Sequence, residues 1–196
     1  MFQAAFQLLA AGSRPILDVG CGVGLLGFYL RARGCQRTVM GIDRDARKIQ
    51  RAHELAAASD SHDLTFQVAD ARTTATNFCG DVVIFDVLHY LPRADQQDLL
   101  RRLAACVEPG GMLIIRDAPR DRCPRFWLTF LAEIFAQTIA WNVKAPLHFP
   151  SRAELGEPFP PKEFSSEARP LWGRTPFNNH LFIFRRRESV TAPPTG

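Results

Sequence analysis

The chain has 196 residues, which is enough for one domain with a proper hydrophobic core and too few for two full-sized domains. Hydrophobic residues make up 46% and charged residues 22%, as in an ordinary soluble globular protein. The net charge of +4 suits an acidic partner or an anionic substrate, but it does not establish nucleic-acid binding.

The cysteines indicate a reducing compartment. Their number, five, is odd, and no pair has C-x-x-C spacing, so neither a disulfide framework nor a metal site is indicated. We therefore expect a cytoplasmic protein. Residues 2–11 predict a short amphipathic helix and not a signal peptide, since glutamines interrupt the apolar residues and no basic segment precedes them. No apolar run is long enough to span a bilayer.

A glycine-rich turn follows the first predicted strand, Ile16 to Val19. Residues 16–27 read ILDVGCGVGLLG, and a helix begins near Gly24 and stops at Gly34. The glycines permit positive φ and leave no Cβ to block a ligand, while the free N–H groups of the helix point back over the turn. This pattern predicts a nucleotide-type site at the carboxyl end of a strand, and its alternative is a glycine turn without a ligand.

The acid within this stretch indicates which cofactor binds there. The G-x-G-x-x-G spacing also occurs in dinucleotide enzymes, but the full pattern, D-x-G-x-G-x-G, resembles motif I of class I S-adenosylmethionine-dependent methyltransferases. Asp18 suits the ammonium and sulfonium groups of S-adenosylmethionine and would repel the pyrophosphate of NAD. The predicted cofactor residues of this turn are Asp18, Gly20, Cys21, Gly22 and Gly24.

The second and third predicted strands end in acids too. Thr38 to Ile42 leads into Asp43-Arg44, where an acid can accept hydrogen bonds from both ribose hydroxyls. The alternative is a cap on the helix from 46 to about 58, but Asp45 fits that cap, which leaves Asp43 for the ribose.

Residues 64–69 form the third predicted strand, and Asp70-Ala71 follow it. The resemblance implies that Asp70 accepts the adenine amino group and that a backbone N–H nearby binds a ring nitrogen. Without the family, Asp70 is equally well a turn residue at the strand end.

The fourth predicted strand, 81–85, is almost continuously apolar, as expected of a strand buried on both faces. We expect Asp86 to Tyr90 to lie at the mouth of the site and Asp86 to bind the cofactor. The segment D-V-L-H-Y-L-P resembles methyltransferases that act on small molecules such as quinones, and it lacks the N/D-P-P-Y/F motif of enzymes that methylate nucleic-acid bases. His89 is the candidate base, with Tyr90 orienting the acceptor, although a lone histidine in such a loop is more often structural.

The later elements complete the sheet. A helix over 93–107 and a P-G-G turn lead into a fifth strand, 112–116. The loop 118–125 carries arginines that either hold an anionic group or are simply solvated. For the apolar helix over 126–141 we favour a core helix on one face of the sheet, and the alternative is that its aromatics line a pocket or a docking surface. Prolines make 142–163 a connection with one short helix, which a capping box starts at Ser151.

Two final strands, 164–171 and 180–186, form an antiparallel pair that class I methyltransferases have and a standard dehydrogenase domain lacks. We thus expect an α/β fold with a Rossmann-like, doubly wound, seven-stranded sheet that is mostly parallel and ends in an antiparallel C-terminal hairpin. Residues 1–186 form one domain in this interpretation, and the tail 187–196 is expected to be disordered.

The predicted activity is methyl transfer from S-adenosylmethionine to a small molecule, such as an aromatic or a lipid-like, polyketide-type metabolite. L-L-G-F-Y-L-R and D-x-D-x-R-K-I also resemble methyltransferases of bacterial aryl polyene pigment clusters. The alternatives are a protein or RNA methyltransferase, a non-catalytic S-adenosylmethionine-binding protein and an NAD-dependent oxidoreductase. We expect neither a nucleic-acid partner nor a resident metal.

Overall fold

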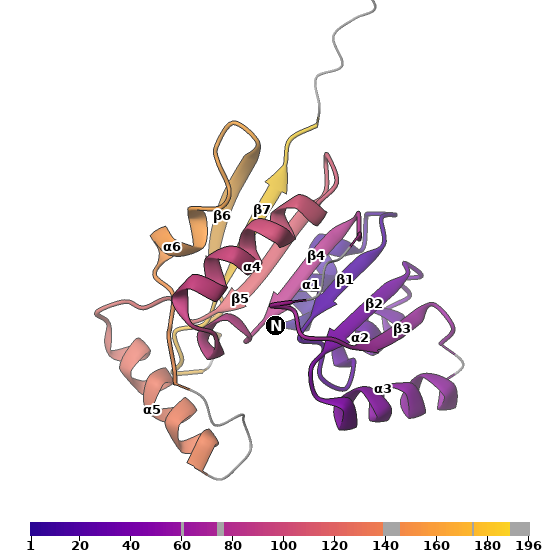
Figure 1. Cartoon of the computed structure of the whole chain (residues 1–196), viewed down its shortest axis with the longest axis horizontal. Coiled ribbons are helices and arrows are strands. Elements are labelled where there is room, and N and C mark those ends of the chain that lie inside the picture. Colours follow the sequence, from indigo (N-terminus) through magenta and orange to yellow (C-terminus); the bar gives the residue numbers. More distant parts are fainter. Residues whose placement is uncertain (60, 74–76, 139–145, 174, 189–196) are drawn as a thin grey trace, which may run out of the picture.

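The computed structural model describes residues 1–59, 61–73, 77–138, 146–173 and 175–188, with only the backbone described for 136–138. Among these residues, seven strands form one sheet in the order β3-β2-β1-β4-β5-β7-β6 (Figure 1). The strands are β1 (Ile16–Val19), β2 (Val39–Asp43), β3 (Leu64–Val68), β4 (Asp81–Phe85), β5 (Met112–Asp117), β6 (Phe164–Pro170) and β7 (His180–Arg186). Strands β1 to β5 pair in parallel, whereas β7 is antiparallel to both β5 and β6. This is the doubly wound sheet with an antiparallel hairpin that the sequence predicts.

Helices cover both faces of the sheet. They are α1 (Phe2–Leu9), α2 (Leu25–Ala32), α3 (Ala46–Ala58), the 3-10 helix η1 (Leu88–Tyr90), α4 (Arg93–Cys106), α5 (Pro124–Thr138) and α6 (Arg152–Gly156). Buried residues of α1, α2 and α3 form one apolar core with the sheet, and buried residues of α4 and α6 form a second core on the other face. The central strands are therefore enclosed on both sides, which explains their continuous apolar sequences.

The side chains of β1 show how the two cores are separated. Leu17 and Val19 belong to the core beneath α4, whereas Ile16 belongs to the core beneath α1 and α2. All three side chains are fully buried. Alternation along a pleated strand thus sends successive apolar side chains into opposite cores.

A buried ion pair lies at the amino ends of β4 and β5. The Arg37 guanidinium pairs with Asp81 at the start of β4, and both side chains are almost inaccessible. The same guanidinium donates to the carbonyl oxygens of Leu9 and Arg14, each over 2.6 Å. Asp81 in turn accepts from the backbone N–H of Met112 at the start of β5 over 2.8 Å. One charge pair therefore connects the end of α1 with β4 and β5.

The local signals in the sequence place most element boundaries correctly. Asp45 caps α3 by accepting from the Arg47 N–H, and the capping box of Ser151 and Glu154 starts α6. Gly34 follows α2 with a positive φ of 81°. The first helix is shorter than expected and ends at Leu9, whose carbonyl oxygen is bound by Arg37. The predicted disordered tail lies outside the described residues from 189 onward.

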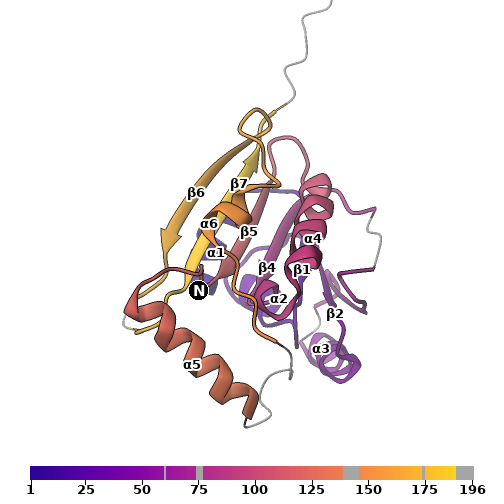
Figure 2. The ribbon, with the colours of Figure 1, turned by 60° about the vertical axis from the view of Figure 1, so that its left-hand side comes forward.

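Helix α5 differs most from the expectation. It begins at Pro124, and it lies beyond the sheet, next to the loops that follow the parallel strands (Figures 1 and 2). Trp127, Leu131 and Phe135 are 59%, 60% and 65% exposed, so the favoured interpretation of a buried core helix is wrong for this face. The opposite face carries the buried Phe126 and Thr129. No described helix is long and apolar enough to cross a bilayer.

We predict that replacing Arg37 by methionine lowers the free energy of unfolding by about 3–5 kcal/mol, because the substitution leaves Asp81 charged, buried and without its counter-ion. Urea unfolding at neutral pH measures the change. The control is Arg51→Met, which removes an exposed pair with Glu54 and is expected to cost under about 0.5 kcal/mol. Equal losses in the two variants would contradict the role given to Arg37.

Candidate active site

The glycine turn between β1 and α2 has the backbone that the sequence requires. Gly20, Gly22 and Gly24 have φ of 74°, 57° and 80°, values that favour glycine. A Cβ on Gly20 would lie 2.2 Å from the Val87 side chain, so this glycine lets the next loop pack against the turn. A Cβ on Gly22 would meet no atom within 4 Å, so the turn is open to a ligand at this position.

Asp43 connects this turn to the end of β2. One carboxylate oxygen accepts from the Gly22 N–H over 2.9 Å, and the other accepts from the Asp45 N–H over 2.8 Å. Asp45, and not Asp43, caps α3. Each Asp43 oxygen keeps further acceptor capacity, since a carboxylate oxygen has two lone pairs.

Asp18 is a buried acid, only 4% exposed, within the strand that precedes the turn. Burial and the neighbouring Asp43 carboxylate raise the pKa of Asp18 to about 7. A cation placed beside these two carboxylates would favour the ionised form of Asp18 and lower its pKa. The pair is thus better suited to a positively charged ligand than to an anionic one.

Asp70 at the end of β3 is already engaged in its own turn. Its carboxylate accepts from the Arg72 backbone N–H over 2.9 Å and forms an ion pair with the Arg72 guanidinium at 2.7 Å. The Arg72 hydrogen bond lowers the pKa of Asp70, so this group is an ionised acceptor at neutral pH. The geometry is compatible with both sequence interpretations, a strand-end turn and an adenine contact.

His89 forms the most enclosed polar contact of the site. Its Nδ1 lies 2.8 Å from Oδ1 of Asp117 at the end of β5, and these side chains are 3% and 0% exposed. The ring stacks on Phe149 with centroids 4.9 Å apart and an interplanar angle of 13°. Burial lowers the pKa of His89, but the charge and hydrogen bond of Asp117, together with Glu133, outweigh it and leave the pKa above its usual value.

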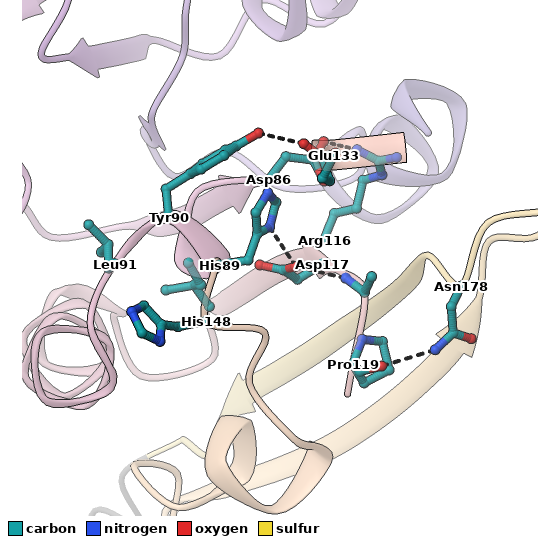
Figure 3. A network of polar contacts seen from close by, with 12 residues as sticks. Asp86, His89, Tyr90, Leu91, Arg116, Asp117, Pro119, Glu133, His148 and Asn178 are labelled. Carbon is teal, nitrogen blue, oxygen red and sulfur yellow. Dashed lines mark hydrogen bonds and ion pairs between the residues drawn. The ribbon is translucent and has the colours of Figure 1, made fainter. Parts of the chain in front are cut away.

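Two further contacts flank the histidine (Figure 3). The Tyr90 hydroxyl donates to the Glu133 carboxylate of α5 over 2.7 Å. Asp86 forms an ion pair with Arg116 of β5, and its own N–H donates to the Arg116 carbonyl oxygen. Asp86 has a φ of 55°, which is uncommon for a residue with a side chain and marks a sharp turn after β4.

A cavity of about 520 Å³ joins these groups. Among the predicted site residues, it is lined by Gly20, Asp43, Arg44, Asp70, Ala71, Asp86, His89 and Tyr90. The other four, Asp18, Cys21, Gly22 and Gly24, do not line it, although Gly22 binds the lining residue Asp43. Because Arg116 and Asp117 of β5 line it too, the cavity lies at the carboxyl ends of all five parallel strands.

Arg116, Asp117 and Glu133 are among the polar lining residues that the sequence interpretation missed. Asp117 follows an apolar strand just as Asp43 and Asp70 do, so the rule that selected those acids also applies to it. Glu133 gives no comparable signal, because it is one acid within an apolar helical pattern.

Residues 16–111 match the family model described as "Methyltransferase domain". The chain contains a class I methyltransferase domain. Its cofactor is S-adenosylmethionine, which such domains use as methyl donor. The described residues fit this cofactor, because the open Gly22 and the acids Asp18 and Asp43 provide space and negative charge for a cationic ligand.

Curated relatives share part of this methyltransferase domain. A carboxy-S-adenosyl-L-methionine synthase of Trichodesmium erythraeum is 30% identical over 116 residues, which cover 57% of this chain and 45% of the relative. A ubiquinone biosynthesis O-methyltransferase of Xanthomonas oryzae pv. oryzae is 30% identical over 109 residues, 56% of this chain and 44% of the relative. The chain thus spans less than half the length of these relatives.

Solved structures share the fold over nearly the whole chain. Magnesium protoporphyrin IX methyltransferase from Synechocystis PCC 6803 with bound SAH has a TM-score of 0.70 at 18% identity, covering 94% of this chain and 81% of that one. The [4+2]-cyclase SpnF has a TM-score of 0.72 at 16% identity, covering 96% and 80%. Proteins named for different reactions thus share the fold, so the substrate has to be argued from the site itself.

We predict that Asp18→Asn raises the free energy of unfolding at about pH 8 by on the order of 2–4 kcal/mol, and changes it little near pH 4. The pKa of Asp18 is about 7 in the folded state and 3.8 in an unperturbed carboxyl group, so the folded state binds more protons and loses stability as pH rises between the two values. Thermal unfolding of both proteins across this range tests the sign. If Asp18→Asn were less stable than the wild type at pH 8, the prediction would be wrong, because the folded protein would then stabilise the ionised carboxylate of Asp18.

Proposed function

We propose that this protein transfers a methyl group from S-adenosylmethionine to a small, largely apolar molecule carrying a nucleophilic group, such as an aromatic or polyketide-type metabolite. The observation that carries the proposal is the continuity of the cavity. It runs from Asp43 and Asp70, at the strand ends expected to hold the nucleoside, to His89 and Tyr90. Phe85, Leu91 and other apolar side chains line the same cavity and suit an apolar acceptor.

In this proposal the cofactor occupies the side of the cavity formed by β1, β2 and β3. Asp43 accepts from the ribose hydroxyls, with Arg44 beside it, and Asp70 and Ala71 contact the adenine. Asp18 and the glycine turn, including Cys21, lie next to the amino-acid portion, and Asp86 lies near the methyl group. When bound, the cofactor supplies a methyl group activated by its sulfonium, so the protein mainly has to align the acceptor and exclude water.

The small-molecule acceptor is supported by the enclosure of the acceptor side. His89 and Asp117 are buried residues of the cavity lining, and α5 contributes Ala132 and Glu133 to the same lining. The relatives point the same way, since a ubiquinone biosynthesis O-methyltransferase is among them. The protein or RNA methyltransferase of the sequence interpretation has no specific observation in its favour.

We also propose that residues 1–186 act as one domain, because β7 pairs with β5 and joins the C-terminal hairpin to the parallel sheet. A cytoplasmic location is proposed from the cysteines, none of which forms a disulfide in the described part of the chain.

Isothermal titration with S-adenosylhomocysteine, with NAD as a comparison, tests the proposed function. We predict micromolar binding of S-adenosylhomocysteine and a loss of about 100-fold or more in Asp43→Ala, because two hydrogen bonds to a charged group disappear. The matched control is Asp45→Ala, which removes the α3 cap and leaves Asp43 in place.

Three outcomes would contradict this prediction. Binding of NAD alone would favour hydride transfer. Binding of neither ligand would remove the basis for methyl transfer. An equal loss of affinity in Asp43→Ala and Asp45→Ala would show that local unfolding, and not a ribose contact, explains the effect.

A further inference from the structure

We propose that the methyl acceptor is a hydroxyl oxygen, phenolic or enolic, and that His89 and Asp117 form a dyad that removes its proton. This inference rests on the proposed methyl transfer and names the acceptor chemistry of the same cavity. His89 is the group that contacts the acceptor. Asp117 is a positioning residue that acts through His89.

The hydrogen bonds determine which ring nitrogen of His89 carries the proton. Asp117 Oδ1 accepts from the Ala118 N–H over 2.8 Å and lies 2.8 Å from Nδ1 of His89. An ionised carboxylate only accepts hydrogen bonds, so Nδ1 is the donor and carries the hydrogen. In the neutral ring Nε2 is therefore the atom with the free lone pair.

That nitrogen is buried and has no hydrogen-bond partner in the described part of the chain. It points away from Asp117, toward the side of the cavity where Glu133 and Asp86 lie (Figure 3). An unsatisfied buried acceptor of this kind carries an energetic cost. A ligand that donates a hydrogen bond to Nε2 would remove this cost.

The ring is also held in place from several sides. It stacks on Phe149, and the His148 backbone N–H donates to the His89 carbonyl oxygen over 2.8 Å. The side-chain amide nitrogen of Gln96 lies 2.6–2.9 Å from the carbonyl oxygens of Leu88, Leu91 and His148. These contacts connect η1 to the segment that carries Phe149. Nε2 of His89 consequently has a fixed direction, as a base requires.

The charges around His89 favour a neutral donor over an ammonium group. Asp117 is bound to His89 itself, Glu133 accepts from Tyr90, and Asp86 is paired with Arg116. Each acid facing the ring thus already has a partner, although Oδ2 of Asp117 is itself buried without a hydrogen-bond partner among the described residues. A protonated amine would need a counter-charge there, and a carbon acid would offer Nε2 no ordinary hydrogen-bond donor. A neutral amine also carries a donor and a lone pair, but it attacks without first losing a proton. A hydroxyl oxygen becomes strongly nucleophilic only when a base removes its proton, so a base at this position favours a hydroxyl acceptor.

The reaction step balances with these groups alone. The acceptor O–H proton moves to Nε2, and the resulting imidazolium is stabilised by Asp117, as an acid–base dyad requires. The oxygen lone pair forms the new C–O bond while the C–S bond to the methyl group breaks. The electron pair of that bond returns to sulfur, which becomes a neutral thioether. After product release, the imidazolium of His89 transfers this proton to water.

The test uses 4-nitrophenol, whose phenolate absorbs visible light, with the full chain saturated by S-adenosylhomocysteine. We predict that binding lowers the apparent pKa of the nitrophenol by about one unit, a tenfold change in the ratio of its ionised to neutral forms. His89→Gln and Asp117→Asn should each abolish most of this shift while still binding S-adenosylhomocysteine. The matched control is Asp121→Asn, an acid that pairs with Arg152 outside the cavity lining and should leave the shift unchanged.

Nitrogen-15 NMR of the imidazole gives a second readout that does not depend on the phenol. The wild type should show hydrogen on Nδ1 in the neutral ring, and Asp117→Asn should lower the pKa of His89, because a charged acceptor becomes a neutral one. A hydrogen on Nε2 in the wild type would overturn the proposal. So would a protein that binds S-adenosylhomocysteine but does not ionise the nitrophenol, or one in which the variants ionise it as the wild type does. Failure to bind S-adenosylhomocysteine would instead refute the proposed function on which the dyad rests.

Discussion

The enclosure of β1, β4 and β5 on both faces is the constraint on which the rest of the molecule depends. A strand with a core on each side has no exposed face for a polar side chain, so polar groups are restricted to its ends or need a partner. Asp86 and Asp117 stand where β4 and β5 leave the apolar layers, and Asp18 lies near the end of β1. Because these strands are parallel, the three acids come to the same edge of the sheet.

The two ends of the sheet treat buried charge in opposite ways. At the amino ends, Asp81 is neutralised by Arg37 and receives a backbone N–H from Met112. At the carboxyl ends, burial and Asp43 raise the pKa of Asp18, and Nε2 of His89 lacks a partner among the described residues. Buried polar groups thus have partners at the amino ends of the strands, whereas some of those at the carboxyl ends have none in the described part of the chain. Such unsatisfied groups are typical of a site where a ligand completes the interactions.

The sequence predicts those features that depend on neighbouring residues. The apolar runs, the cap at Asp45, the capping box at Ser151 and the glycine turn each need only a few adjacent positions, and the structure contains them all. Pairings across the fold are harder to predict. His89 meets Asp117 28 positions away, and Tyr90 meets Glu133 43 positions away. Their register depends on how β5 and α5 pack, which no local pattern encodes.

The apolar helix after the parallel strands shows a different limit. Its composition favours burial, but composition alone does not tell which face meets the protein. Phe126 packs against Phe149 with ring centroids 5.4 Å apart, whereas Trp127 beside it is mostly exposed. Adjacent aromatic residues of one helix point in directions about 100° apart, so both environments occur within a single turn.

The position of β7 between β5 and β6 has a consequence for synthesis of the chain. The apolar edge of β5 stays without its neighbour until residues 180–186 have been made, although β5 itself ends at Asp117. An unpaired apolar strand edge readily pairs with other chains. During synthesis on the ribosome, the edge of β5 therefore remains unpaired while α5, α6 and β6 are made. When β7 follows, it pairs with this edge and removes the risk of association with other chains.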